Sequence, residues 1–569
     1  MMQREEKAQT NPNQSERRTG EILGFILKTS GKTKVYVAIL LLVQGLLGIS
    51  SVFYALFLKQ IFDAAALREG QRFFRMSLGL VLLVLLQLLF NAMVRFLQEY
   101  AISYYENILK GRLFGGLLLG DYEQVHRVHS GEWMNRLTGD TVVVAEGTVT
   151  ILPGVVGMGV KLLSAMAVLL YMVPRFAYIL IPGGLLLLVL TYAFRKVMKK
   201  LHKNMREKDG LVRIFMQDHL SSLMVVKAFG RENRALDEAG ERMRIHRSAR
   251  MKKNHFSNLC NVGFGGVMNG AYVLGVIYGG MQIMSGAMTY GTLIAILQLI
   301  GQVQSPFANL TMYLPKYYAA LASAERLMDV DAYGEEDVRG LEADYRDFTA
   351  LNMNHVFFEY DDHEEELPKE AFANLTFSVQ RGEMVAFTGP SGCGKSTALK
   401  LLMAMYRPGK GTVTVTSADG RQIPILPAAR CLFAYVPQGN QLMSGSIREV
   451  VTFGQKADTV EDALVWEALH TACADDFVRE LDTGLDYSLG ENGNGLSEGQ
   501  MQRIAIARAI YSKRPVLLLD EATSSLDEAT EYSVLKRLHE VSGQTVIIVT
   551  HRPAALAFAD RQIMFGCND

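Results

Sequence analysis

Long apolar stretches occupy the first half of the chain, whereas the apolar runs of the second half are short. Six of the long stretches reach the roughly 20 residues that an α-helix needs to span a bilayer. They are Val35–Phe62, Met76–Leu97, Thr148–Met172, Phe176–Phe194, Phe256–Met284 and Thr289–Leu314. This pattern predicts an all-α membrane domain with six helices.

The connections between these stretches alternate in length. Turns such as Val173-Pro174-Arg175 and Ser285-Gly286-Ala287 are short, but two other connections are long. The connection from Arg195 to Lys253 is rich in basic residues, namely Lys199, Lys200, Lys203, Arg206, Arg242, Arg244, Arg247 and Arg250. Because basic loops stay in the cytoplasm, the long connections are predicted inside and the short ones outside. We expect these basic residues to line solvated helices rather than an anionic lipid or nucleic-acid site.

The second half of the chain has the pattern of an α/β domain. Strand-like runs alternate with helical patterns there, at Met384–Thr388, Leu432–Val436, Val516–Leu519 and Thr545–Val549. We predict a polar tail over 1–20, a transmembrane domain over 21–325, an acidic linker over 326–348 and an α/β nucleotide-binding domain over 349–569. The charged stretch Asp361–Glu370 is predicted to be a solvated loop.

Composition agrees with a multidomain membrane protein. Hydrophobic residues make up 49% of the 569 residues and charged residues 20%, and the mean hydropathy is +0.12, so part of the chain is expected in lipid. The formal net charge is zero, which gives no reason to expect a nucleic-acid partner. Five cysteines lie without metal-ligand spacing, and their odd number argues against a disulfide framework. The mostly polar residues before the first span are too few for a peptidase domain, so we do not expect a leader-cleaving peptide exporter.

The clearest chemical motif begins at Gly389. It fits the phosphate-binding pattern G-x-x-x-x-G-K-[ST] and consists of Gly389, Pro390, Ser391, Gly392, Cys393, Gly394, Lys395 and Ser396. A strand-like run precedes it and a helix-prone run beginning at Thr397 follows, so backbone N–H groups are expected to converge on phosphates. Lys395 would then contact the phosphates and Ser396 would coordinate Mg²⁺. Cys393 occupies a variable position of the motif, where a thiol reagent is expected to block nucleotide binding.

A second motif ends the apolar run Val516–Leu519 with two carboxylates, Asp520 and Glu521. Ligands bind at the carboxyl ends of buried parallel strands. Asp520 is therefore a candidate Mg²⁺ ligand, and Glu521 is a candidate for orienting or deprotonating the attacking water.

Further motifs give the chain a resemblance to the ATP-binding cassette (ABC) transporter family. Leu496-Ser497-Glu498-Gly499-Gln500 resembles the family's L-S-G-G-Q signature, with Glu498 in place of the first glycine. Other matching segments are Tyr435-Val436-Pro437-Gln438, Gly490-Glu491-Asn492-Gly493, Ser524-Ser525-Leu526-Asp527 and Thr550-His551-Arg552. Two stretches in the long connections, Ser130–Asp140 and Val225–Glu232, resemble those around the family's coupling helices. The arrangement is similar to that of an exporter-type half-transporter.

The resemblance implies roles for individual residues. It implies catalytic roles for Glu521, His551 and Gln438, with Mg²⁺ held by Ser396, Gln438 and Asp520. ATP would be bound by Tyr360, which is expected to stack on adenine, by Thr397 and the phosphate loop, and, from a second half-transporter, by Ser497, Gly499 and Gln500. We expect the side chain of Glu498 to point away from the γ-phosphate, and the far edge of the cassette after His551 to be shorter than is usual in the family.

These expectations describe an ATPase in the cell membrane, with both termini and the cassette in the cytoplasm. It would move a small-molecule, lipid or peptide substrate, most plausibly outward, and a homodimer is favoured over a heterodimer. An importer and a regulatory membrane-anchored ATPase remain alternatives. Lys161, mid-way along the third stretch, is expected either to contact substrate or to lie in a hydrated chamber. Five amides are expected to line the path or tie helices together: Gln87, Asn91, Asn269, Gln298 and Gln302.

Overall fold

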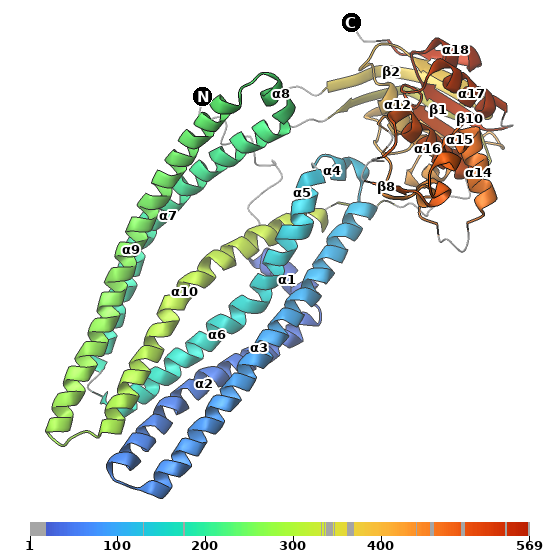
Figure 1. The fold of residues 1–569 in the computed structure, drawn as a ribbon. Helices are drawn as coiled ribbons and strands as arrows, with labels where there is room; N and C mark the ends of the chain where they lie inside the picture. Colours follow the sequence, from blue (N-terminus) through green and yellow to red (C-terminus); the bar gives the residue numbers. More distant parts are fainter. Residues whose placement is uncertain are drawn as a thin grey trace. The chain divides into compact units, whose positions relative to one another are not determined.

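A computed structural model describes residues 19–566, apart from 129, 175–176, 332, 335, 337–344, 346, 361–368, 440, 456–459, 491–494 and 541–542. The chain forms two compact units. One contains Glu16–Leu113 and Met134–Met328, and the other joins Phe114–Trp133 to Asp329–Asp569. Each unit is described separately below, with the elements labelled as in Figure 1.

The first unit is built from long helices. Its elements are α1 (Thr19–Thr29), α2 (Thr33–Ala66), α3 (Gly70–Leu119, up to Leu113), α6 (Thr141–Met172), α7 (Ala177–Ser221), α8 (Leu223–Ala228), α9 (Glu232–Met284) and α10 (Tyr290–Asp331, up to Met328). All six predicted membrane stretches fall on helices, in the order α2, α3, α6, α7, α9 and α10. Among the described residues, four helical segments are long and apolar enough to cross a membrane: Thr33–Ala66, Gly70–Leu119, Ser130–Met172 and Glu232–Met284.

The basic connection between the fourth and fifth stretches is itself helical. Figure 1 shows α7 and α9 running side by side, with the short helix α8 at the turn between them. Basic side chains such as Lys203 and Arg244 are exposed and pair with acidic residues on their own helices. Solvated helices therefore form this connection, as the charge pattern predicts.

Two polar contacts tie the membrane helices together. Gln302 of α10 donates from Nε2 to the backbone oxygen of Ser51 on α2 at 2.5 Å, and Ser51 Oγ donates to Gln302 Oε1 at 3.1 Å. Gln87 of α3 donates to Ser50 Oγ at 3.1 Å. Asn91, in contrast, donates to the backbone of its own helix. Two of the predicted amides thus act as links between helices.

A π-helical turn, Arg136–Asp140, precedes α6. Asp140 is buried at this turn and receives two hydrogen bonds from Arg326 of α10, at 2.8 and 2.5 Å, and one from Ser323 at 2.8 Å. Because a π turn inserts one residue into the helical repeat, it rotates the side chains that follow. The turn is thus fixed in place by a buried carboxylate.

The described part of the second unit contains two large sheets and one two-stranded sheet. A five-stranded parallel sheet has the order β11-β3-β10-β9-β6, and a four-stranded antiparallel sheet has the order β2-β1-β4-β5. The strands of the parallel sheet are β3 (Met384–Thr388), β6 (Phe433–Val436), β9 (Val516–Asp520), β10 (Thr545–Val549) and β11 (Arg561–Met564). The antiparallel strands are β1 (Phe348–Tyr360), β2 (Lys369–Gln380), β4 (Lys410–Ser417) and β5 (Gln422–Pro424), and β7 (Gly445–Ser446) pairs with β8 (Ser488–Leu489).

Two helices of this unit come from the first long connection, and the others alternate with the strands. They are α4 (Tyr122–His126), α5 (Ser130–Asn135, up to Trp133), α12 (Lys395–Leu402), α13 (Ile447–Val451), α14 (Asp462–Thr471), α15 (Asp475–Glu480), α16 (Glu498–Tyr511), α17 (Glu528–Glu540) and α18 (Pro553–Phe558), with 3₁₀ turns η4 (Pro427–Leu432) and η6 (Gly484–Asp486). β9 and β10 are buried along their whole length, as is typical of central strands covered on both faces.

The charged loop predicted between β1 and β2 is shorter in the structure than expected. The loop was predicted over Asp361–Glu370, but Lys369 and Glu370 already belong to β2, where they pair with Tyr360 and Glu359 of β1. The rest of that loop, most of the acidic linker and the loop at 491–494 lie outside the described residues. After His551, the chain forms α18 and then β11, which pairs with β3 as the edge strand of the parallel sheet.

Candidate functional site

Four neighbouring parallel strands deliver the candidate residues to one edge of the sheet. The phosphate loop follows β3, His551 follows β10, Asp520 ends β9 and Gln438 follows β6. Because the strands are parallel and adjacent, their carboxyl ends meet at the same edge, where ligands bind in open α/β sheets. The sheet topology therefore gathers residues that are more than 150 positions apart in sequence at one edge.

The phosphate loop has the backbone geometry of an anion-binding loop. Gly389, Gly392 and Gly394 all have positive φ, and Gly394 is the left-handed residue immediately before α12. A Cβ on Gly394 would lie 2.6 Å from Phe372, so both conformation and space require glycine there. Loops of this type turn their N–H groups inward, and the N-terminus of α12 adds its partial positive charge.

Lys395 is buried and its ammonium group lies across the loop. Nζ donates hydrogen bonds to the backbone oxygens of Gly389 at 2.8 Å and Pro390 at 2.7 Å. Cys393 is also buried, with its Sγ 3.7 Å from the same Nζ. The Lys395 ammonium is thus held within the loop that would receive phosphate oxygens.

Oxygen-bearing side chains cluster beside the loop. Ser396 Oγ donates to Asp520 Oδ1 at 2.8 Å, and the hydroxyl of Tyr435 donates to Asp520 Oδ2 at 3.1 Å. Burial raises the pKa of Asp520, although the two hydroxyl donors partly counter this effect by stabilising the carboxylate. Burial, followed by the negative charge of Asp520, also raises the pKa of Tyr435, so its hydroxyl remains a donor at neutral pH.

Glu521 is held in an unusual backbone conformation. Its φ of 52° is in the left-handed region, which is rare for a residue with a side chain and is found mostly at functional sites. Glu521 Oε2 accepts a hydrogen bond from Gln438 Nε2 at 2.7 Å. The side chains at the ends of β9 and β6 are therefore joined, next to the oxygens of Ser396 and Asp520.

Serine hydroxyl, carboxylate and amide oxygens are the ligands that Mg²⁺ prefers. The residues Ser396, Asp520 and Gln438 supply these three kinds of oxygen at one edge of the sheet, so the donor set fits a magnesium ion bound together with phosphate oxygens. Within the described residues, no cluster of three or more His, Cys, Asp or Glu suggests a second type of metal site.

Tyr360 lies at the end of β1, close to the start of α12. Its hydroxyl is 2.8 Å from Thr397 Oγ1, and its ring contacts Phe358 and Tyr406 edge to face. Burial raises the pKa of Tyr360. An aromatic side chain is thus fixed beside the phosphate loop, although its role in stacking on a base stays a prediction.

The signature segment caps α16. Ser497 Oγ accepts a hydrogen bond from the N–H of Gln500, and the Gln500 side chain accepts one from the N–H of Ser497, which together form a capping box. Glu498 is exposed in the first turn of this helix, where a negative charge interacts favourably with the helix dipole.

Gly499 is required because the backbone of another segment approaches it closely. A Cβ at this position would lie 2.9 Å from the carbonyl oxygen of Ser525. Gln502 fastens the same two segments, since its side chain donates to Ser524 Oγ at 3.1 Å and accepts from the N–H of Ser525 at 3.0 Å. The signature helix and the segment 524–527 therefore form one rigid element.

Two further residues were not singled out from the sequence. Arg552, directly after the exposed His551, donates to the backbone oxygens of Ser524 and Leu526 at 2.6 and 2.7 Å and to the buried carboxylate of Glu531 at 3.0 Å. These contacts tie the His551 segment to segment 524–527. The sequence offered one signal for such a partner. Glu531 lies three and four residues before the apolar residues Val534 and Leu535 of α17, so it shares their buried helix face.

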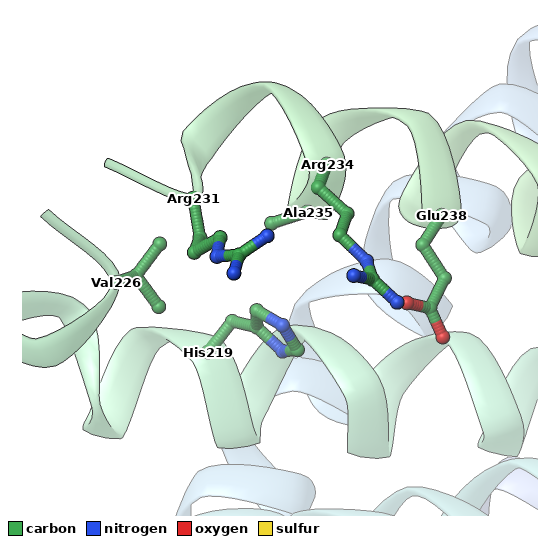
Figure 2. Close-up of a pocket in the computed structure, with 6 residues that line it drawn as sticks. All are labelled: His219, Val226, Arg231, Arg234, Ala235 and Glu238. Carbon is green, nitrogen blue, oxygen red and sulfur yellow. The ribbon is translucent and has the colours of Figure 1, made fainter. Parts of the chain in front are cut away.

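A pocket of different character lies in the helical unit, between α7 and α9 (Figure 2). It is lined by His219, Val226, Arg231, Arg234, Ala235 and Glu238. A hydrogen bond from Arg242 and the charges of Arg242, Arg234 and His219 lower the pKa of Glu238, so the cations here have an internal counter-ion. None of the predicted nucleotide residues lines this pocket.

Comparisons with known proteins agree with this architecture. Residues 35–307 match the family model described as ABC transporter transmembrane region, and residues 372–524 match the model described as ABC transporter. The predicted order, a helical membrane domain followed by an α/β nucleotide-binding domain, is confirmed by these two matches together with a similar solved structure. That structure, of a bacterial Atm1-family ABC exporter with ATP bound, has a TM-score of 0.75, 24% identity and 94% coverage of both chains.

Two curated relatives span most of the chain. The ATP-dependent lipid A-core flippase of Pasteurella multocida (strain Pm70) is 28% identical over 528 residues, which cover 88% of this chain and 86% of the relative. A multidrug resistance ABC transporter ATP-binding and permease protein of Lactococcus lactis subsp. lactis (strain IL1403) is 27% identical over 469 residues, which cover 80% and 76%. Both similarities extend over the membrane part and the cassette.

Proposed function

The chain belongs to the ABC transporter family as an exporter-type half-transporter whose ATPase is coupled to transport, and from this premise we propose that it exports a hydrophobic or amphipathic substrate. The observation that supports the proposal most is the convergence of Lys395, Ser396, Asp520 and Glu521 at one edge of the parallel sheet. The substrate would be a drug, a lipid or a peptide, moved by alternating access across the cell membrane. The two curated relatives named as a lipid flippase and a multidrug transporter are consistent with this range.

The chemistry proposed for the near side of the site follows from the side chains. Lys395 binds β- and γ-phosphate oxygens, and the N–H groups of residues 391–396 bind the same anion. Ser396, Asp520 and Gln438 would hold Mg²⁺, which neutralises developing negative charge on the phosphates. Glu521 orients the attacking water and accepts its proton, while His551 contacts the γ-phosphate from the neighbouring strand end.

The signature segment is proposed to act on the nucleotide of a second half-transporter. Ser497 Oγ accepts the bond from Gln500 N–H, so its own hydroxyl proton remains available to a phosphate oxygen. Gly499 and Gln500 bind the same partner nucleotide. Because every candidate catalytic residue is present in this chain, we propose a homodimer with two hydrolytic sites, with a heterodimer as the alternative.

Within the cassette unit, the first long connection contacts the nucleotide-binding domain directly. Asp121 accepts a hydrogen bond from Arg407 at 3.4 Å, and the ring of Tyr122 packs edge to face on Tyr406. Tyr406 in turn contacts Tyr360. A change at the proposed adenine site would therefore reach the first long connection through side-chain packing, and ATP would act by favouring one of two arrangements.

Glu521→Gln tests the proposed chemistry. The substitution removes the proton acceptor but keeps the side-chain shape, so ATPase activity is expected to fall by about a hundredfold or more while ATP binding persists. The exposed Glu540 at the end of α17 offers a matched control, and Glu540→Gln is expected to retain wild-type turnover. Wild-type rates in Glu521→Gln would contradict the assignment.

The direction and purpose of transport need a separate measurement. In sealed inside-out vesicles, an exporter accumulates an amphipathic dye when ATP is added outside, whereas an importer depletes it. Accumulation that disappears in Glu521→Gln supports export. ATP turnover that responds to no candidate substrate, with no movement of dye in either direction, would favour the regulatory ATPase instead.

A further inference from the structure

The membrane helices contain one charged side chain at mid-depth. Lys161 lies 11 residues before the end of α6, or roughly 16 Å along the helix axis, near the middle of a bilayer. Lys59 and Arg95 also fall within apolar stretches, but close to their ends, where long side chains reach the interface. The six stretches contain no Asp or Glu at all.

The ammonium group of Lys161 faces α10. Its Nζ donates to Ser305 Oγ at 3.0 Å, and Ser305 lies one turn beyond Gln302, which binds α2 through Ser51. Nearby residues of α6 and α10 belong to a buried apolar cluster, namely Ala165, Leu169, Ile300 and Val303. The amine is therefore half-buried beside a region of low polarity, with a neutral hydroxyl as its partner.

In the described part of the chain, the partner of the Lys161 ammonium is uncharged. Among the residues that the structure describes, no carboxylate pairs with Lys161. A second copy of the chain brings the same six stretches, which have no acidic residue to offer. By contrast, the cations of the pocket in Figure 2 share it with Glu238. An ionised lysine in the membrane is costly unless it is paired or hydrated, so an anion from outside the protein would bind favourably at this position.

We propose that Lys161 and Ser305 bind the anionic headgroup of the transported amphiphile, so that substrates with a phosphate or carboxylate head are preferred. This inference rests on the proposed export of amphiphiles and narrows it to one charge class. The ammonium supplies the charge, and the Ser305 hydroxyl can turn its proton toward a headgroup oxygen. The acyl chain would lie along apolar helix surface.

The test uses full-length protein in nanodiscs of zwitterionic lipid. Binding and stimulation of ATPase activity are measured with probes that share a dodecyl chain: dodecyl phosphate, dodecanoate and dodecyltrimethylammonium. Inorganic phosphate serves as the soluble anion. In the wild type, the two anionic amphiphiles are expected to bind more tightly than the cationic one, and phosphate alone is expected not to compete.

Lys161→Gln should weaken binding of dodecyl phosphate by roughly tenfold or more, the effect of losing a charged hydrogen bond. Lys161→Arg should restore most of it. Binding of the cationic probe should not weaken, and Lys316→Gln, at an exposed position of α10, is the matched loss of charge that should leave dodecyl phosphate binding unchanged. Correct folding of each variant is checked by its melting temperature and elution volume.

The possible failures can be told apart. If Lys161→Gln weakens all probes equally or none, the assignment of Lys161 is overturned while export of amphiphiles still stands. If phosphate alone competes fully, the site binds free anions and the amphiphile preference is overturned. If no amphiphile of any charge binds or is transported, the proposed function itself fails.

Discussion

The cassette and the membrane helices differ in how their functional residues are held. In the cassette, residues from four strand ends meet at one sheet edge, where Ser396 is bonded to Asp520 and Gln438 is bonded to the next residue, Glu521. In the membrane helices, the polar groups form separate links, such as Gln302 with Ser51 and Gln87 with Ser50. The cassette therefore has one chemical centre, whereas the helices have dispersed polar contacts.

The difference follows from the two kinds of secondary structure. In a parallel sheet, the end of each strand has a fixed position, so a motif at that end has a fixed place in space. A membrane helix needs only to be apolar and long enough, and many helix arrangements satisfy that condition. Substitutions in the cassette should thus act on catalysis, while substitutions in the helices should act on stability and selectivity.

Among the substitutions that test this comparison, Gly499→Ala in the signature has the largest expected effect. The new Cβ would meet the carbonyl oxygen of Ser525 at 2.9 Å, so α16 must move away from segment 524–527. We expect ATPase activity to fall by at least about tenfold, since small displacements of binding groups have large effects on rate. Steady-state ATPase assays of the purified protein measure this.

The neighbouring residue provides the control. Glu498 is exposed in the first turn of α16, so Glu498→Gln should change turnover by less than about twofold. If both variants lost activity equally, charge rather than backbone contact would control the signature, and the geometry described for Gly499 would be the wrong explanation.

An intermediate effect is expected from Arg326→Gln in the helical unit. The change leaves the buried carboxylate of Asp140 without its two guanidinium hydrogen bonds. Because Arg326 is partly exposed, we expect a loss on the order of 2 kcal/mol and a melting temperature lower by several degrees. Thermal unfolding in detergent, followed by fluorescence, measures the change.

Arg244→Gln is the matched variant, because Arg244 makes a similar pair of hydrogen bonds to Glu241 at an exposed site. Its melting temperature should change little, since surface ion pairs contribute little to stability. Equal effects of the two substitutions would show that burial of Asp140 is not what stabilises the π turn.

The smallest effect is expected from Tyr435→Phe and concerns pH. Burial already raises the pKa of Asp520, and the Tyr435 hydroxyl opposes that rise by donating to the carboxylate. Removing the donor should raise this pKa further, so protons compete with Mg²⁺ at a higher pH. As the solution is acidified, Mg²⁺-dependent nucleotide binding should therefore weaken. In the variant, it should weaken at a higher pH than in the wild type. Titrations at several pH values test this, and an unchanged or lower midpoint would contradict it.

Much of this architecture was predictable because its signals are local. The apolar stretches identified the helices on which all six predicted spans lie, and the strand-like runs identified β3, β6, β9 and β10 to within one residue. The contacts of Arg552 with segment 524–527 and the π turn at Arg136–Asp140 were not predicted, because each depends on partners distant in sequence. The start of β2 at Lys369 was also missed, since charged residues are poor indicators of strands.

One carboxylate has a practical consequence for protein engineering. Glu336 pairs with Arg430 and also accepts a hydrogen bond from the N–H of Tyr122 at 3.1 Å, so it joins the connection between α3 and α6 to segments that follow α10. Chimeras that exchange cassettes between half-transporters by cutting only after the last helix would separate Glu336 from its native partner Tyr122, and Arg407 from its native partner Asp121. Grafts that carry residues 114–133 along with the cassette would preserve this junction.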